Sequence, residues 1–396
     1  MKITKFKYDF SSFFLLEIIL VSGMGICTIF GWHQMISLLF ALTFIALFIY
    51  IVVDAFSNGL SIKLHALTII LVAFSVLNVL LDLFFEGGAL SFDYIKKLIM
   101  FCSFMLLLSY AVREDTAVTD RYLQFIKLMP VVTALIFVVS FLFFGNKDEI
   151  SGGIILGFSN PNATAMWLLH LLFFCVLFVL ESIKHAKWGL GVAILLPILV
   201  YMIIRTRSRS CIIGLAAFVF LVLLGIFKRK PSKIVLFLIA IFPMLFAVAY
   251  LLIVDAEWFN SLFSFASGEG KPLSSRVDVW SDALEAFMKD PIVGTYYSIS
   301  DGTGVSQLHN THIDVLCSYG IVPAILFVKI LYDSLKSVNK KFNSWYGYIA
   351  FCAFCSVIVV GAFEATIVAG SMGLNILTVS FLVLSRSGFV SHNSET

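Results

Sequence analysis

The chain has 396 residues, of which 60% are hydrophobic and 13% are charged, and its formal net charge is +3 at pH 7. The mean hydropathy is +1.01. Soluble domains contain about 45–50% apolar and about 25% charged residues, so the composition excludes a water-soluble globule. Lipid requires every backbone polar group to be paired within its own segment, and we therefore expect an all-α, polytopic transmembrane helix bundle. No basic tract indicates a nucleic-acid partner.

Apolar windows of roughly 17–22 residues, the length that crosses a bilayer, recur along the whole chain. They form one integral membrane domain over residues 1–396, without a separate soluble domain. The first window lacks a small-residue cleavage site, which favours a span over a cleaved signal peptide. About twelve spans are predicted, near residues 12–31, 36–54, 64–84, 95–112, 124–144, 163–181, 189–204, 211–227, 233–254, 315–333, 346–363 and 370–385.

Lys and Arg residues in the connections predict the orientation, because cytoplasmic loops carry their excess. When both termini are placed in the cytoplasm, the cytoplasmic connections carry more Lys and Arg than the outer ones. This orientation puts residues 255–312 outside, as a large loop between the ninth and tenth spans. The sequence RTRSRS departs from this rule, since it puts Arg205, Arg207 and Arg209 on the outer face. These arginines either snorkel at a tight helix hairpin or serve a purpose there. The basic KRKPSK loop one span later supports the orientation and so favours a purpose.

The loop over residues 255–312 is predicted to contain an amphipathic helix. Ser275 and Asp278 have the spacing of a capping box, apolar residues that include Trp280 recur at helical spacing, and Pro291 ends the pattern. Arg276 falls in the first turn, where a cation has the unfavourable sign for the helix dipole. That position suggests an anionic partner for Arg276, and the alternative is an exposed, solvated arginine.

The segment closes with His309, Asn310, Thr311 and His312. Thr311 and Asp314 have capping-box spacing, so a helix is expected to start here and to run into the membrane. His309 would then lie just before a helix N-terminus, which favours the neutral imidazole that a general base requires. His312 competes for the same role, and a surface histidine in a loop is the structural alternative. Asp314 either orients His309 or caps the helix.

A second external loop ends in Asn160-Pro161-Asn162, which opens the sixth predicted span. This tripeptide is a turn and helix-start signal, and its amides could also bind sugar hydroxyls. Motifs that would indicate other chemistry, the Walker loop, GxGxxG, HEXXH, DXD and GxSxG, do not occur in the sequence. We therefore expect neither a cofactor nor a metal. Few carboxylates fall within the spans, which disfavours a proton-coupled transporter.

In this order the motifs resemble those of bacterial O-antigen and capsule polymerases of the Wzy type and of the related O-antigen ligases. The matching pieces are Asn160-Pro161-Asn162, Ser208-Arg209-Ser210 at the start of a span, Arg276 with Trp280, and LHNTHIDVLCSYGIVPAIL over residues 308–326. The resemblance covers residues 157–330. RTRSRS contains three arginines, whereas the family motif has one, so the correspondence is not unique. We assign Arg209 to the family's arginine, with Arg205 and Arg207 as the alternatives.

The resemblance implies a metal-independent, inverting glycosyltransferase that uses an undecaprenyl-pyrophosphate-linked glycan as donor and another such glycan as acceptor. It implies catalysis by His309, Arg276 and Arg209 at the outer face of the cytoplasmic membrane. Partners of this kind of protein include the lipid bilayer, a chain-length regulator and a flippase. The implied substrate-binding residues are Arg205, Arg207, Asn160, Asn162, Trp280, Asn310 and His312.

Three functions remain open from the sequence. A polymerase is favoured over an O-antigen ligase because the Asn-Pro-Asn and His-Asn-Thr-His segments resemble polymerases more closely. A polysaccharide-lipid flippase or other transporter would line a central cavity with charges. The unusual charges of this chain instead gather on one face, which favours an external active site.

Overall fold

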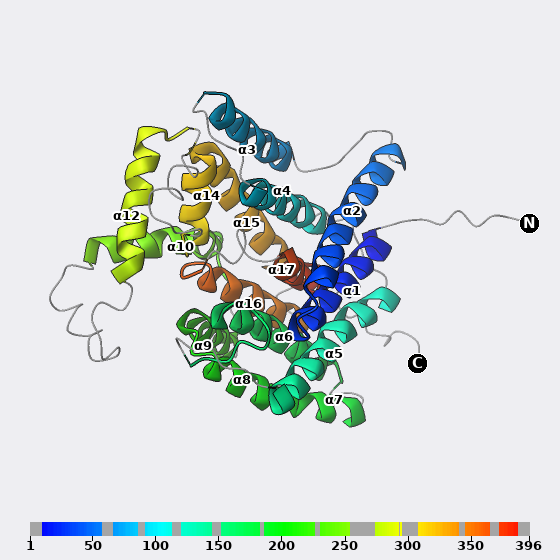
Figure 1. Cartoon of the computed structure of the whole chain (residues 1–396). Coiled ribbons are helices and arrows are strands. Elements are labelled where there is room, and N and C mark those ends of the chain that lie inside the picture. The colour runs from blue at the N-terminus through cyan, green and yellow to red at the C-terminus, as the bar shows by residue number, and fades with distance from the viewer. Residues whose placement is uncertain are drawn as a thin grey trace, which may run out of the picture.

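The computed structural model describes residues 10–57, 66–85, 92–112, 120–144, 152–182, 186–225, 230–253, 274–292, 294, 308–339, 345–364 and 372–386. Over these ranges all regular elements are helices, and they pack as a bundle (Figure 1). The predicted all-α class is confirmed. Most of the outer loop, including residues 254–273 and 295–307, lies outside the described part of the chain.

Each stretch that the sequence predicts as a span contains one or two helices, which cover most of its described residues. The first nine predicted spans correspond to α1 (Phe10–Ile29), α2 (His33–Ser57), α3 (Ala66–Phe85), α4 (Phe92–Val112), α5 (Asp120–Phe144), α6 (Pro161–Ser182), α7 (Ala186–Ala193) with α8 (Leu195–Arg205), α9 (Arg209–Leu224) and α10 (Lys233–Ile253). After the outer segment with α12 (Ser274–Lys289) follow α14 (Thr311–Tyr319), α15 (Ile321–Asn339), α16 (Trp345–Val360) and α17 (Met372–Arg386). Two predicted spans, residues 189–204 and 315–333, are each divided into two helices.

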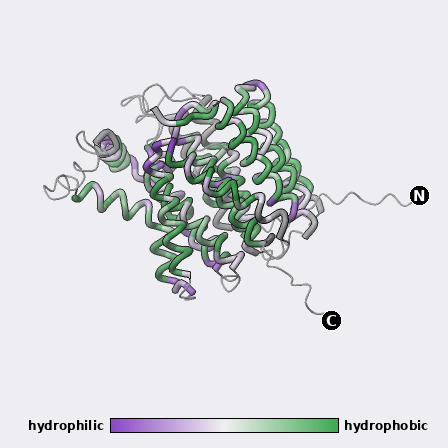
Figure 2. The backbone as a smooth tube through the Cα atoms, turned by 90° about the horizontal axis from the view of Figure 1, so that it is seen from below, coloured by the Kyte–Doolittle hydropathy of each residue, from purple (hydrophilic) through white to green (hydrophobic). Residues whose placement is uncertain are grey.

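Among the described residues, five helical stretches are long and apolar enough to cross a membrane. They are Phe10–Ile29, His33–Asp54, Gln124–Phe143, Pro161–Leu180 and Lys233–Ile253. Hydrophobic residues run along most of the remaining backbone as well, with α12 as an evident polar exception (Figure 2). The chain is therefore an integral membrane protein, and the full number of spans stays a prediction.

Helices α16 and α17 form the centre of the bundle. Nearly all their described side chains are buried, on every face of each helix. Helix α17 packs closely against α1 around the indole of Trp167, because a Cβ added to Gly25 or Gly373 would lie within 3 Å of that ring. A helix that is apolar all round belongs in the interior of such a bundle, and this pair anchors the rest.

Helix α12 is the amphipathic helix that the sequence predicts in the outer segment, and its bounds agree within two residues. It lies at the edge of the bundle beside α10 and α14 (Figure 1). Its apolar face buries Trp280, Ala283 and Phe287 in a small core of its own that includes Tyr250 of α10 and Ile313 of α14. The other face is exposed and carries the ion pair between Glu285 and Lys289.

The break between α14 and α15 connects α12 to the membrane helices. Gly320 has φ +86, a conformation that L-residues with a side chain rarely adopt. The break frees the backbone N–H of Ile321, which donates to the carbonyl of Pro291 at the end of α12, at 2.9 Å. Gly294 follows with φ +82 and lies so close that an added Cβ would be 2.6 Å from the Cys317 carbonyl oxygen. The outer helix is thereby fixed to this kink.

Helices α9 and α16 approach each other at Gly214. The hydroxyl of Ser356 donates to the Gly214 carbonyl at 2.6 Å, and a Cβ on Gly214 would lie 2.3 Å from Cγ2 of Val360. This contact places the N-terminus of α9 beside the residues that follow α16.

We expect Gly214→Ala to destabilise the protein by about 1–3 kcal/mol, because the added methyl group overpacks against a β-branched side chain that cannot rotate away freely. Gly191→Ala in α7 is the matched control, since nothing lies within 4 Å of the added Cβ. Thermal unfolding of both purified variants checks this: equal melting temperatures for the two would contradict the packing described here.

Candidate functional site

The N-terminus of α14 is held by Asn310, which is fully buried. Its side-chain oxygen accepts from the backbone N–H groups of His312 and Ile313, at 3.0 and 3.1 Å. Its amide nitrogen donates to the carbonyls of Pro243, at 2.9 Å, and Ala362, at 3.1 Å. The sequence placed the cap one residue later, at Thr311. The structure corrects this, and asparagine is indeed among the best N-cap residues.

The other side of this contact is the turn of α10 that contains Pro243. Pro243 interrupts the hydrogen-bond ladder of its helix, because it lacks an N–H. Two carbonyls of that turn accept from α14: Pro243 from Asn310, and Ala240 from Nε2 of His312 at 2.8 Å. Burial lowers the pKa of His312 to about 4, while the Ala240 hydrogen bond acts in the opposite direction. His312 is therefore neutral at pH 7 and joins α14 to α10.

His309 immediately precedes the cap and has φ +50, in the left-handed region. A residue with a side chain is uncommon there, and such strain persists only where the surroundings fix it. Nδ1 of His309 lies 2.9 Å from Oε2 of Glu364. The side chain of His309 is 36% exposed and that of Glu364 only 5%. Glu364 thus holds the imidazole ring from the buried side, and part of the ring remains accessible from outside.

Glu364 follows α16 and contacts the starts of two other helices, α6 and α14. Besides His309, its Oε1 accepts from Nδ2 of Asn162 at 2.9 Å, and its backbone carbonyl accepts from the hydroxyl of Thr311 at 3.1 Å. The backbone N–H of Thr311 in turn donates to the carbonyl of Gly361 at 2.8 Å. The start of α6, the start of α14 and the end of α16 therefore meet at one carboxyl group.

The N-terminus of α9 lies at the same end of the bundle. Gly214 of α9 contacts Ser356 and Val360 near the end of α16, so α9 begins beside the segment that carries Glu364. Arg209 is the first residue of α9 and its side chain is exposed. The structure thus brings the helix that begins with Arg209 to the carboxyl group that holds His309.

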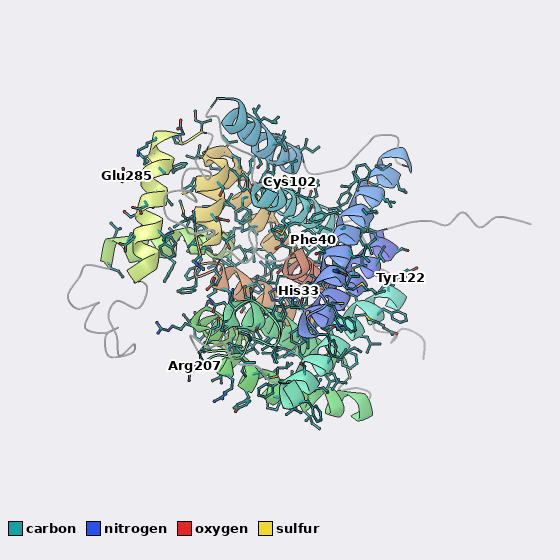
Figure 3. The ribbon with its side chains drawn as sticks, viewed as in Figure 1. His33, Phe40, Cys102, Tyr122, Arg207 and Glu285 are labelled. Atoms are coloured by element: carbon teal, nitrogen blue, oxygen red, sulfur yellow. The ribbon has the colours of Figure 1, made fainter. Side chains whose placement is uncertain are left out.

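The other two arginines of RTRSRS are also exposed, in the turn between α8 and α9. Arg207 has φ +60 and lies at the edge of the bundle near these helices (Figure 3). The carbonyl of Arg205 accepts from the N–H of Ile154 at 3.2 Å, and a Cβ on Gly152 would lie 3.4 Å from the Arg207 guanidinium. The loop before α6 therefore packs on the arginine turn, so the two outer loops form one surface.

Helix α12 carries Arg276 in its first turn, but the side chain of Arg276 lies outside the described ones. Trp280, one turn later, is fully buried. Its indole N–H donates to the carbonyl of Leu308 at 2.6 Å. Trp280 therefore fixes the residue before His309, and it has no exposed surface in this structure to offer a substrate.

The remaining predicted site residues divide into two groups. Asn162 reaches the site through Glu364, whereas Asn160 accepts from the N–H of Ala163 at 2.8 Å and caps α6. Asn310 and His312 are buried and hold helices together. Sequence analysis missed the role of Glu364: the available signal was a lone carboxylate at the outer end of a predicted span. Among the described residues, no group of three or more His, Cys, Asp or Glu side chains could hold a metal ion.

A bundle of apolar helices with a histidine, a carboxyl group and arginines gathered at one end defines a membrane protein with a site at its surface. Residues 193–328 match the family model described as O-Antigen ligase. This range extends from α7 to α15 and includes the arginine turn, α12 and His309. The match confirms the resemblance to the O-antigen ligase and polymerase family, and it indicates a glycosyltransferase-like function in polysaccharide biosynthesis. No curated protein matches the chain.

We expect Trp280→Phe to lower stability by about 1–3 kcal/mol, because it leaves the buried Leu308 carbonyl without its donor. Trp345→Phe is the matched control, since Trp345 is 54% exposed. Thermal unfolding of the purified variants measures the difference. If both variants melted alike, the indole hydrogen bond would not support the segment before His309.

Proposed function

We propose that this protein is a polysaccharide polymerase that joins undecaprenyl-pyrophosphate-linked oligosaccharide units at the outer face of the cytoplasmic membrane. The observation that carries the proposal is the pairing of a partly exposed His309 with a buried Glu364, close to where α9 begins beside the end of α16. A base, a group that orients it and an anion-binding helix end are what glycosyl transfer from a pyrophosphate requires.

His309 is the general base of this proposal. Its Nδ1–H donates to Glu364, which leaves the lone pair of Nε2 for the acceptor. Nε2 takes the proton of an acceptor sugar hydroxyl while the oxygen attacks the anomeric carbon of the donor. The bond from that carbon to the pyrophosphate oxygen breaks on the opposite face, and its electron pair leaves with the pyrophosphate. The anomeric configuration is inverted.

Arg209 and Arg276 stabilise the departing pyrophosphate. A guanidinium group can form two parallel hydrogen bonds to phosphate oxygens and stays charged at any physiological pH. Arg209 stands at the first position of α9, where the backbone N–H groups also favour an anion. Arg205 and Arg207 extend the same cationic surface. In this proposal the guanidinium groups stabilise the negative charge that develops on the leaving pyrophosphate in the transition state.

The ligase is the second candidate, and the family description favours it. In that reaction the same base and the same arginines transfer a finished polysaccharide to a different acceptor, so the site alone fits both. The two functions differ in the acceptor, and the products in cells separate them.

We expect His309→Ala, Arg209→Ala and Arg276→Ala, each expressed at the wild-type level in a strain that lacks the protein, to abolish the surface polymer. Loss of a general base or of one charged donor costs about 10²–10⁴-fold in rate. Electrophoresis of surface glycan is the measurement. Single repeat units indicate a polymerase, and polymer that accumulates on the lipid carrier indicates a ligase. Full activity in all three variants would refute the site.

The contribution of Glu364 can be separated from that of the arginines. We expect Glu364→Gln to lower kcat by about 10²–10⁴-fold with little change in KM for the donor, because glutamine has one acceptor oxygen in place of two and cannot accept from both His309 and Asn162. Arg209→Ala should raise KM as well, since Arg209 binds the donor directly. Steady-state kinetics on the purified protein measure both constants. A rise in KM alone for Glu364→Gln would mean that Glu364 binds substrate and does not position the base.

A further inference from the structure

Residues 152–162 form a short segment that contacts both halves of the candidate site. The segment is the described part of the loop before α6 together with the first two residues of that helix. Ile154 and Leu156 are buried and belong to the main core. Leu156 has φ +43, and a residue with a side chain keeps such a backbone only where its surroundings fix it. The path of the segment is therefore determined by its contacts.

One end of the segment holds the arginine turn between α8 and α9. A Cβ on Gly153 would lie 2.3 Å from the carbonyl oxygen of Thr206, so only glycine allows the two backbones to approach this closely. Thr206 is buried, and its hydroxyl oxygen accepts from the backbone N–H of Ser208 at 3.2 Å. Ser208 is the residue immediately before Arg209. The position of Gly153 therefore constrains the position of Arg209.

The other end of the segment reaches the proposed base. Nδ2 of Asn162 donates to Oε1 of Glu364 at 2.9 Å, and Oε2 of the same carboxyl group lies 2.9 Å from Nδ1 of His309. Between the two ends, the hydroxyl of Thr164 donates to the carbonyl of Ile155 at 2.6 Å and joins the loop to the first turns of α6. One continuous piece of chain thus contacts the arginine turn and the carboxyl group that holds His309.

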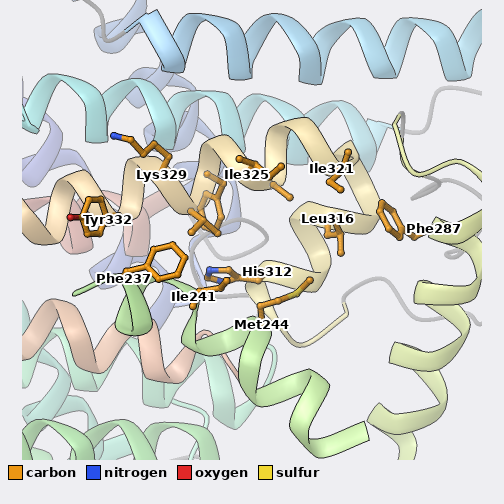
Figure 4. Close-up of a pocket in the computed structure, with 13 residues that line it drawn as sticks. Phe237, Ile241, Met244, Phe287, His312, Leu316, Ile321, Ile325, Lys329 and Tyr332 are labelled. Carbon is orange, nitrogen blue, oxygen red and sulfur yellow. The ribbon is translucent and has the colours of Figure 1, made fainter. Parts of the chain in front are cut away.

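Helix α14, which His309 immediately precedes, has a cavity of about 640 Å³ along one of its faces. His312 and Leu316 line it from α14, and α10 and α15 form most of its other walls (Figure 4). Side chains that face a cavity lack partner atoms on that side, whereas most of a protein interior is close-packed. Packing on this face therefore constrains α14 less, and hydrogen bonds such as that between His309 and Glu364 contribute more to its position.

We propose that residues 152–162 set the separation between the arginine turn and the imidazole of His309, with Gly153 and Asn162 as the positioning residues. The inference rests on the proposed function and adds residues that do not touch the substrate. In an inverting transfer the base and the groups that stabilise the leaving group lie on opposite sides of the anomeric carbon, so their separation must match the substrate. A misplacement of about 1 Å can cost about 10²-fold in rate. Asn162 thus acts through Glu364 and does not bind a sugar.

Binding of undecaprenyl pyrophosphate to the purified full chain tests the end at the arginine turn. We expect Gly153→Ala to weaken binding by at least about fivefold, because the added methyl group displaces the Thr206 carbonyl and with it Arg209. Thr206→Val, which loses the acceptor for Ser208 and adds no bulk, should weaken binding as well. Gly191→Ala is the matched control, since nothing lies within 4 Å of its added Cβ. Thermal unfolding shows which variants are folded.

Steady-state kinetics test the other end, with the lipid-linked glycan extracted from the strain that lacks the protein as donor and acceptor. We expect Asn162→Ala to lower kcat by about 10–100-fold with KM unchanged. In a Glu364→Gln background it should cost no further activity, because both changes act on one hydrogen-bonded group. Asn339→Ala is the control, because it also loses one hydrogen bond, to the Pro231 carbonyl.

Two results would overturn the inference and leave the proposed function standing: unchanged binding in Thr206→Val and in folded Gly153→Ala, or additive losses in the double variant. A rise in KM alone for Asn162→Ala would also overturn it, since Asn162 would then bind the glycan. If the wild type neither binds undecaprenyl pyrophosphate nor transfers sugar from the extracted donor, the proposed function fails and the inference fails with it.

Discussion

The buried side chain of Asn310 is the interaction on which the site depends. Its amide group joins the first turn of α14 to the turn of α10 that contains Pro243 and to the residues after α16. A buried amide that lost one of these partners would carry the full cost of an unpaired polar group. The four contacts therefore act together, and they fix where α14 begins. His309 is the residue immediately before that point, so its backbone position follows from the cap.

The strained backbone of His309 follows from this arrangement. His309 lies between two fixed residues. Asn310, which follows it, caps α14, and Leu308, which precedes it, accepts the hydrogen bond of the Trp280 indole. Between two fixed neighbours the chain can adopt φ +50, and the imidazole then meets Glu364 and still has an exposed edge. Strain at a site is retained when the surroundings over-determine it. The same helix, α12, carries Trp280 and Arg276, so the residue that supports the segment before His309 and the proposed phosphate ligand belong to one element. Its attachment at Gly320 extends this coupling to the start of α15.

The sequence predicted the helices well because hydrophobic length and periodicity are local properties. Each predicted span is helical over most of its described residues, and the amphipathic helix over Ser274–Lys289 has nearly the expected bounds. Two predicted spans proved to be pairs of helices. One of the breaks is at Gly320, which has the φ of +86 that glycine readily adopts and packs against Gly294, a residue distant in sequence. The predicted cap, Thr311, and the observed cap, Asn310, also differ because of tertiary contacts. Both residues can cap a helix, and the carbonyls of Pro243 and Ala362 decided between them.

The parts of the candidate site that the sequence did not predict depend on tertiary contacts. Glu364 is 55 residues from His309 and 202 from Asn162 along the chain, so no local pattern connects them, and it lies outside the range that matches the family model. Trp280 was expected at the substrate because the family resemblance implies it there, but its helical spacing equally predicts a buried face, and Trp280 is buried. His309 and Glu364 thus come from different parts of the chain, and the buried contacts of Asn310 and His312 with α10 and with the end of α16 hold α14 where the two side chains meet.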